Sequence, residues 1–383
     1  MHRQDMLRRC TDFLSSTVLT VFCLVALMIL VIACTLAQVR LGVNPSVAQY
    51  IRSFIVWWRP EELPFPVPVF PGGGLVGGVL LINLGVAQFL RLERSWRKAG
   101  LWIMHFGLAL LLIGEFATAL LQVESRMSIE EGQTVNFSED THRMELAVID
   151  VTDGDSDDVR SIPESLFKSR SEIADASLPF VLRVHAFYEN AQLRRRGSED
   201  PPTQATAGIG TEVLVRPAPR PAGEADDMPA ALIEPRGREG RSYGVFLLSP
   251  ALGAAQEFLH EGRRWSMSLR PRRYYMPFSL TLKDFRHDVY PGTNIPKNFS
   301  SLVRLLDARA GDDRDVLIFM NSPLRHGGLT FYQASFGKND TLSVLQVVRN
   351  PSWTLPYISC LLVAIGLLWH FGLMLRRTLG VRS

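Results

Sequence analysis

The sequence predicts a multi-span α-helical membrane protein, with four transmembrane helices and one large, mainly β extracytoplasmic domain. Three observations lead to this fold class. Four segments are rich in apolar residues and nearly free of charge, whereas residues 122–353 have an ordinary globular composition. Within that globular stretch, β-branched and alternating runs predominate. Arginine and lysine gather at the ends of the apolar segments, which is typical of the cytoplasmic flanks of membrane helices.

The N-terminal part of the chain predicts two membrane helices. Residues 1–13 are polar and are expected to form a cytoplasmic N-terminus, and residues 14–38 form the first transmembrane helix. A cleaved signal peptide is the alternative, but the apolar run exceeds the core of about 7–15 residues that signal peptides have. Residues 39–71 predict an outer loop with an extended, proline-rich end. The glycine-rich residues 72–90 predict the second transmembrane helix.

The third predicted helix, residues 100–121, connects the membrane segments to the large domain. Its apolar core is 21 residues long, Leu101–Leu121. At about 1.5 Å per residue this core would span about 31 Å, the thickness of one bilayer core. A basic cytoplasmic loop, residues 91–99, precedes the helix, and the extracytoplasmic domain, residues 122–353, follows it.

The fourth predicted helix, residues 354–375, ends in a basic tail, residues 376–383. In a four-span topology the N-terminus, the loop before the third helix and this tail all lie on one side. The positive-inside rule places that side in the cytoplasm. We therefore expect a multi-pass protein of the bacterial cytoplasmic (inner) membrane, with its large domain on the periplasmic or outer side.

Ten runs in the large domain have the residue pattern of β-strands. They are residues 145–151, 180–188, 211–216, 243–248, 265–270, 278–285, 301–306, 315–320, 329–334 and 342–348. Two stretches interrupt the pattern. Residues 153–158 predict an acidic loop, and residues 194–224, rich in Pro, Gly and Arg, predict a flexible segment.

Two histidines in the membrane helices are candidate cofactor ligands. An ionisable residue inside a membrane helix is a functional hypothesis, and imidazole is a frequent ligand of metals and haem iron. His105 lies about 6 Å from Leu101 and His370 about 9 Å from Arg376 along their helices, which suggests similar depths. Two such imidazoles could bind one haem iron from opposite sides. Alternatively, each reaches lipid headgroups or a backbone carbonyl.

Three glycines recur every seven residues in the third predicted helix, Gly100, Gly107 and Gly114. Such a stripe of small residues predicts close packing against another helix. Glu115, the other ionisable residue of the apolar core, is expected to lie at the outer membrane interface.

Several function classes are disfavoured. No basic stripe with interleaved aromatic residues is present, so no nucleic acid partner is expected. The cysteines are Cys10, Cys23, Cys34 and Cys360, and none lies in residues 122–353, so that domain has no internal disulfide or redox Cys-X-X-Cys pair. Its histidines lack metal-ligand spacing, and no nucleophile elbow or phosphate-binding loop occurs.

The end of the large domain carries a distinctive pattern. Residues 284–301 read DFRHDVYPGTNIPKNFSS, and residues 316–335 read VLIFMNSPLRHGGLTFYQAS. This resembles the ResB (CcsB) family of cytochrome c biogenesis proteins, in which two such strands precede the last transmembrane helix. Turn residues and strand packing give the motif an expected structural role. Its residues here are Asn321, Pro323, Gly328, Phe331, Tyr332 and Gln333.

The resemblance implies a subunit of a System II cytochrome c maturation complex, which takes haem across the membrane and presents it for covalent attachment. The implied partners are a CcsA (ResC) type membrane protein, apocytochrome c, thiol reductant proteins of the pathway, and membrane lipid. The implied cofactor is transient haem b. A transmembrane histidine that binds haem in the family corresponds to His105, and no family residue corresponds to His370. Trp57-Trp58 does not match the tryptophan-rich motif of the partner.

As such a subunit, the chain would be a non-redox component of a haem-ligating (cytochrome c synthetase) complex. The alternative function is a non-enzymatic scaffold that stabilises the CcsA-type partner without binding haem. A solute transporter is disfavoured, because the sequence has four spans and no inverted repeat.

Overall fold

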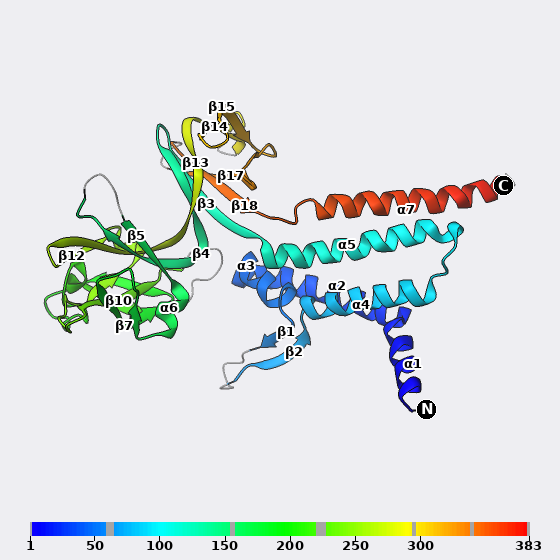
Figure 1. The fold of residues 1–383 in the computed structure, drawn as a ribbon, viewed down its shortest axis with the longest axis horizontal. Helices are drawn as coiled ribbons and strands as arrows, with labels where there is room; N and C mark the ends of the chain where they lie inside the picture. The colour runs from blue at the N-terminus through cyan, green and yellow to red at the C-terminus, as the bar shows by residue number, and fades with distance from the viewer. Residues whose placement is uncertain are drawn as a thin grey trace. The chain divides into compact units, whose positions relative to one another are not determined.

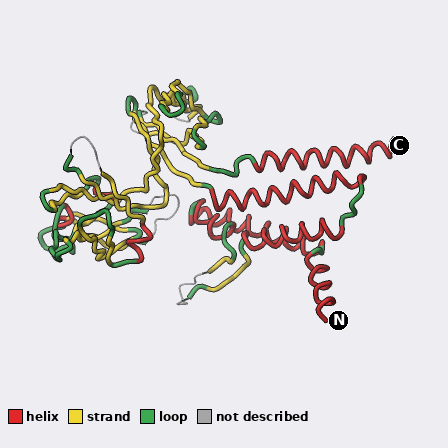
Figure 2. The backbone as a smooth tube through the Cα atoms, in the orientation of Figure 1, coloured by secondary structure: helices red, strands yellow, loops and turns green. Residues whose placement is uncertain are grey.

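The computed structural model describes residues 2–58, 65–153, 158–219, 227–292, 296–337 and 341–380. The chain forms two compact units. The helical unit contains the chain up to Val123 and from Arg349 onward, and the β unit lies between them in sequence. Figure 2 shows that helices dominate the first unit and strands the second.

Four helices of the helical unit are long and apolar enough to cross a membrane. They are α2 (Thr17–Leu41), α4 (Gly73–Arg91), α5 (Ala99–Leu121), which follows the short 3-10 turn η2 (Trp96–Lys98), and α7 (Leu355–Thr378) (Figure 1). Together with the large antiparallel β domain, they confirm the fold class expected from the sequence. The chain is therefore a multi-pass membrane protein.

The first membrane helix begins at Thr17 rather than at residue 14, because the helical conformation is interrupted after α1 (His2–Leu14). The Ser16 hydroxyl accepts a hydrogen bond from the Val18 amide at 3.2 Å and caps α2. Asn83 of α4, only 1% exposed, donates to the carbonyl oxygens of Leu14 (2.6 Å) and Ser16 (3.0 Å). The break is thus stabilised by polar groups that the hydropathy pattern does not reveal.

The predicted outer loop, residues 39–71, contains regular structure. It has a short helix, α3 (Val43–Ser46), and a π-helical turn, η1 (Val47–Ile51). Strands β1 (Ile55–Trp58) and β2 (Val67–Pro71) pair antiparallel. The two-stranded edge tolerates the prolines of β2, which lack an amide donor.

Among its described residues, the β unit contains one α-helix, α6 (Glu164–Ser169), and many strands. The strands are β3 (Val123–Glu130), β4 (Thr134–Asp150), β5 (Asp158–Pro163), β6 (Glu172–Ala174), β7 (Phe180–Tyr188), β8 (Ala191–Arg195), β9 (Val213–Pro217), β10 (Ala230–Gly237), β11 (Phe246–Leu248), β12 (Gln256–His260), β13 (Arg263–Val289), β14 (Pro296–Asp307), β15 (Asp312–Phe319), β16 (Leu324–His326), β17 (Leu329–Gly337) and β18 (Leu342–Arg349).

Two long strands, β4 and β13, pair antiparallel and serve two separate cores (Figure 1). The first core includes Leu146 of β4 and Trp265 of β13. The second core includes Val135 of β4 and Leu280 of β13. The largest sheet has the order β15-β14-β13-β4-β3-β18-β17-β16, and a smaller sheet, β11-β10-β7-β6, packs on the first core.

The sequence predicted two strands, 265–270 and 278–285, where the structure has the single strand β13. The polar residues between the two predicted strands remain paired with β4, because their side chains find partners on that strand. Arg273 pairs with Glu139 of β4, with the Arg273 Nε 2.9 Å from the Glu139 Oε1. The register shifts next to Pro271, which cannot donate a ladder hydrogen bond.

The expected flexible segment, residues 194–224, contains regular structure. Strand β8 ends inside the segment and pairs antiparallel with β9, and a 3-10 turn, Ile209–Glu212, precedes β9. Residues 220–224 of this segment, and residues 154–157 of the predicted acidic loop, lie outside the described residues.

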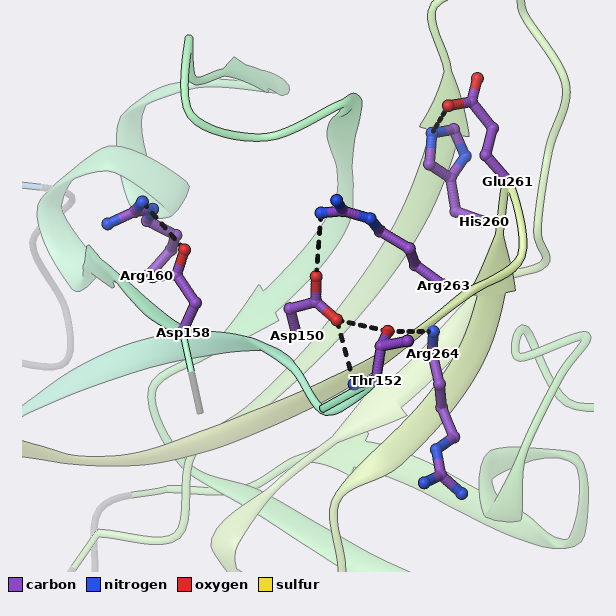
Figure 3. A network of polar contacts seen from close by, with 8 residues as sticks. All are labelled: Asp150, Thr152, Asp158, Arg160, His260, Glu261, Arg263 and Arg264. Atoms are coloured by element: carbon purple, nitrogen blue, oxygen red, sulfur yellow. Dashed lines mark hydrogen bonds and ion pairs between the residues drawn. The ribbon is translucent and has the colours of Figure 1, made fainter. Parts of the chain in front are cut away.

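Hydrogen bonds and ion pairs hold the ends of β4 and β13 together at Asp150 (Figure 3). The Asp150 carboxylate accepts a hydrogen bond from the Thr152 hydroxyl at 2.5 Å and lies 3.2 Å from Arg263 Nη1. The Thr152 hydroxyl oxygen accepts the Arg264 amide at 2.9 Å. The Thr152 hydrogen bonds, helped by Arg263, lower the pKa of Asp150, so the carboxylate remains ionised and keeps these contacts at neutral pH.

Buried carboxylates cross-link the first core. Glu145 of β4 lies 2.9 Å from Arg270 Nε and accepts a short hydrogen bond from Ser161. Glu234 of β10 lies 2.7 Å from His185 Nε2 and 2.9 Å from Arg236 Nε. Both carboxylates are paired, as burial of charge requires.

Candidate functional site

The predicted glycine stripe packs against α7. Gly100, Gly107 and Gly114 are the buried residues of α5. A Cβ added to Gly100 would lie 2.6 Å from the Gly366 carbonyl oxygen, and one added to Gly107 would lie 3.0 Å from that of Ser359. The two helix backbones are therefore in direct contact, which confirms the packing expected from these small residues.

His105 lies on the face of α5 that is turned away from α7. At about 100° per residue, it is about 140° from Gly100 and about 160° from Gly107 around the helix. The ring is half-buried, and its Nδ1 lies 2.7 Å from the Leu101 carbonyl oxygen. A carbonyl can only accept, so Nδ1 carries the proton of this hydrogen bond. In the neutral ring the lone pair is then on Nε2, the nitrogen free to bind an iron.

Contacts with α4 lie on this same side of α5. Gln88 Nε2 donates to the Trp102 carbonyl oxygen at 3.2 Å. Further along, a Cβ added to Gly77 would lie 3.5 Å from the Phe116 ring. By helix periodicity, His105 lies within about 60° of both Trp102 and Phe116. The histidine therefore belongs to the α4 side of the helical unit.

His370 lies at a different height from His105. A Cβ on Gly100 would lie 2.8 Å from the His370 backbone nitrogen, so His370 is level with Gly100. His105 is five residues further along α5, about 7.5 Å away along the axis. The sequence predicted similar depths for the two histidines on the assumption that Leu101 and Arg376 lie at the same height. The glycine contacts instead place His370 level with Gly100, so the two histidines lie at different heights. The half-buried His370 ring packs against Phe371, with 5.6 Å between ring centroids.

The close contact between α5 and α7 limits how the two histidines could share a haem. No space for a porphyrin exists where the backbones touch at Gly100 and Gly366. A haem bound by both histidines would have to lie beside the helix pair. The structure therefore does not bring His105 and His370 together as opposed ligands across α5 and α7.

Other candidate ligands are few. Among the described residues, no group of three or more His, Cys, Asp or Glu side chains is arranged to hold a metal ion. Glu115 is exposed on α5. Of the free cysteines, Cys10 and Cys360 are exposed, and Cys23 and Cys34 are buried in the helical unit. His105 is thus a candidate whose ring is held at Nδ1 while Nε2 stays available.

The motif residues between β15 and β17 shape the second core. Asn321 has a φ of 64° and Gly328 a φ of 76°, left-handed values that suit Asn and Gly in turns. Pro323 lies between these turns, just before β16. Phe331 is fully buried, and Tyr332, on the opposite face of the strand, is 37% exposed. These residues thus form turns and pack in or beside the second core.

Gln333 takes part in a hydrogen-bond cluster with two buried serines. The Ser301 hydroxyl donates to the Gln333 Oε1 at 2.6 Å and lies 2.7 Å from the Ser343 hydroxyl. Gln333 Nε2 donates to the Ser335 carbonyl oxygen at 3.2 Å. Ser301 and Ser343 are fully buried, so this cluster links β14, β17 and β18 through satisfied polar groups. The motif includes Ser301 and Gln333, but no sequence pattern pointed to Ser343.

Comparison with known proteins agrees with this segment. The ResB-like family model matches residues 255–344, from just before β12 into β18. Protein NrfI of Wolinella succinogenes is 34% identical over 100 residues, which are 26% of this chain and 11% of NrfI. The match thus spans about one tenth of the length of that relative. Residues 255–344, which contain the Gln333 cluster, are thus the part of the chain that is similar to the ResB-like family.

Proposed function

We propose that this chain is a subunit of a System II-type cytochrome c maturation complex that takes haem across the membrane. With a CcsA-type partner, it would present haem for covalent attachment to apocytochrome c. The match of residues 255–344 to the ResB-like family supports a role in cytochrome c biogenesis, and the four apolar helices would provide the membrane path. The observation that carries the haem assignment is His105, whose Nδ1 is held by the Leu101 carbonyl oxygen at 2.7 Å.

In this proposal His105 supplies one axial ligand to haem, which is cargo. The second ligand comes from the partner, because α5 and α7 touch at Gly100 and Gly366 and exclude iron from between them. A fixed ring with a free Nε2 binds iron without losing further rotamer freedom. His370 then serves helix packing.

The proposed division of labour follows from the distribution of thiols. Residues 122–353 contain no cysteine, so thioether bonds would form between the haem vinyl groups and the cysteines of apocytochrome c. Thiol reductant proteins would keep those cysteines reduced, and this chain would be a non-redox component. The β unit would lie on the outer side, as the basic flanks of the helices favour, and would position the partner and the apocytochrome.

A non-enzymatic scaffold is the second candidate function. It is favoured by one observation, namely that the described motif residues serve packing and turns rather than a reactive site. A scaffold would stabilise the CcsA-type partner without binding haem.

The test is cytochrome c assembly in a bacterial host that lacks its own maturation system and expresses this chain with its CcsA-type partner. Haem staining measures covalently attached haem, and immunoblotting measures the partner. We expect His105→Ala to abolish haem staining while partner abundance is unchanged. Normal staining in His105→Ala, with loss of the partner only when the whole chain is deleted, would support the scaffold instead.

A further inference from the structure

A shallow, widely open pocket of about 560 Å³ lies where α4 ends and α5 begins. Its apolar walls come from Phe89 of α4 and from Ala99, Trp102 and Ile103 of α5. Arg94 and Ser95 form its polar rim. Because His105 is not part of the pocket, a ligand bound there would be independent of the proposed function.

The aromatic walls are held in place by specific contacts. Phe89 and Trp102 pack edge to face, with ring centroids 5.6 Å apart. Trp102 Nε1 donates to the Glu93 carbonyl oxygen at 3.3 Å. Trp96, also in the lining, packs edge to face on Trp369 of α7 at 5.0 Å. The pocket is therefore a shaped feature of the helix ends.

The charge on the rim is uncompensated. Glu93, the neighbouring carboxylate, pairs with Lys98 at 2.8 Å. In the part of the chain that the structure describes, Arg94 has no hydrogen-bond or ion-pair partner. A guanidinium thus lies beside an apolar pocket at the end of two membrane helices. This arrangement suits a ligand with one anionic group and a long apolar part.

We propose that this pocket binds an anionic phospholipid, with its phosphate at Arg94 and part of an acyl chain against Phe89, Trp102 and Ile103. Guanidinium groups bind phosphate oxygens through two parallel hydrogen bonds. Basic residues next to membrane helices attract anionic lipids, and tryptophans favour the membrane interface. The bound lipid would join the ends of α4 and α5 in the membrane leaflet that faces the basic loop.

Native mass spectrometry of the detergent-solubilised full chain tests this site, with phosphatidylglycerol and phosphatidylcholine supplied at equal concentrations. We expect wild type to retain phosphatidylglycerol preferentially. Arg94→Gln should lower its retention about tenfold, the effect of losing a charge-assisted hydrogen bond. Arg97→Gln is the matched control, because Arg97 is an exposed residue of the same segment outside the pocket lining.

A second variant, Ile103→Trp, fills the pocket and keeps every charge. It should lower retention of phosphatidylglycerol as Arg94→Gln does, and thermal midpoints near that of wild type would show that both variants fold. Equal losses in Arg94→Gln and Arg97→Gln would mean diffuse attraction to a basic surface and would overturn the proposal. Unchanged retention in Ile103→Trp would overturn it too. No lipid on wild type, together with loss of partner binding in Ile103→Trp, would assign the pocket to a partner helix.

Discussion

Gly100 and Gly366 bring α5 and α7 into backbone contact, since a Cβ built on either glycine would lie 2.6 Å from the carbonyl oxygen of the other. Both obstructing atoms belong to the backbone, so no side chain can move aside to make room. The contact fixes the register of the two helices. It thereby fixes the heights of His105 and His370.

Gly100→Ala should separate the two helices and destabilise the helical unit. Overpacking of this kind costs about 1–3 kcal/mol. The measurement is thermal unfolding of the purified protein in detergent, followed by helical circular dichroism. Gly85→Ala in α4 is the control, because a Cβ there meets no atom within 4 Å, and alanine favours the helix by about 1 kcal/mol. Equal losses in both variants would contradict the proposed contact.

Gln333→Ala should loosen the junction of β14, β17 and β18. The change leaves the buried hydroxyl groups of Ser301 and Ser343 short of a partner, at a cost of about 1–3 kcal/mol. Hydrogen exchange measured by mass spectrometry should show faster exchange in these three strands. Gln346→Ala is the control, since its amide bonds the exposed side chain of Glu124 at 3.2 Å. Unchanged protection in Gln333→Ala would show that the cluster does not hold the strands.

Glu234 should make the β unit sensitive to acid. Burial opposes its ionisation, but hydrogen bonds from Ser242, Arg236 and His185 prevail and lower its pKa from 4.5 to about 2. The unfolded chain therefore binds a proton more readily, and the stabilisation, complete above the unfolded pKa, is lost as pH falls through the folded pKa. The loss runs from about pH 4.5 toward about pH 2.

The check is the thermal midpoint of Glu234→Gln and wild type between about pH 6, above this window, and about pH 3, inside it. The variant should be less stable at neutral pH, because it removes the charge of a buried carboxylate whose partners Arg236 and His185 are half-exposed, a loss of about 1–3 kcal/mol. Its midpoint should also fall less than that of wild type on acidification. Glu239→Gln, at an exposed carboxylate nearby, should follow wild type. Parallel pH profiles for all three proteins would rule out this role of Glu234.

The membrane helices could be predicted because length and apolar composition suffice to mark a span. The interruption of the helix at Ser15 and Ser16 could not be predicted, because it depends on Asn83, which is 67 residues from Ser16 in the chain. The glycine stripe of α5 likewise predicted a close helix contact but did not identify the helix that makes it. Only the fold identifies Gly366 of α7 as that partner.

In the β unit, too, features set by neighbouring residues could be predicted, whereas those set by residues far apart in the sequence could not. Alternating residues predicted the strand Phe180–Tyr188 with its observed bounds. Residues 271–277 were predicted as a gap between two strands, because the charge of Arg273 finds its partner Glu139 on β4, which the sequence does not place there. Ser343 lies 42 residues from Ser301, so no pattern joins them. The candidate ligand His105 was found from its position alone, and its height relative to His370 required the helix register.

The most direct test of the account is a reduced-minus-oxidised absorption spectrum of this chain purified with its CcsA-type partner. Wild type should show a Soret band with low-spin features, and His105→Ala should lose it. His370→Ala, the matched change on the neighbouring helix, should keep the band, because His370 is assigned to packing. A spectrum that survives in His105→Ala, or is lost in His370→Ala alone, would contradict the assignment of His105 as the haem ligand of this chain.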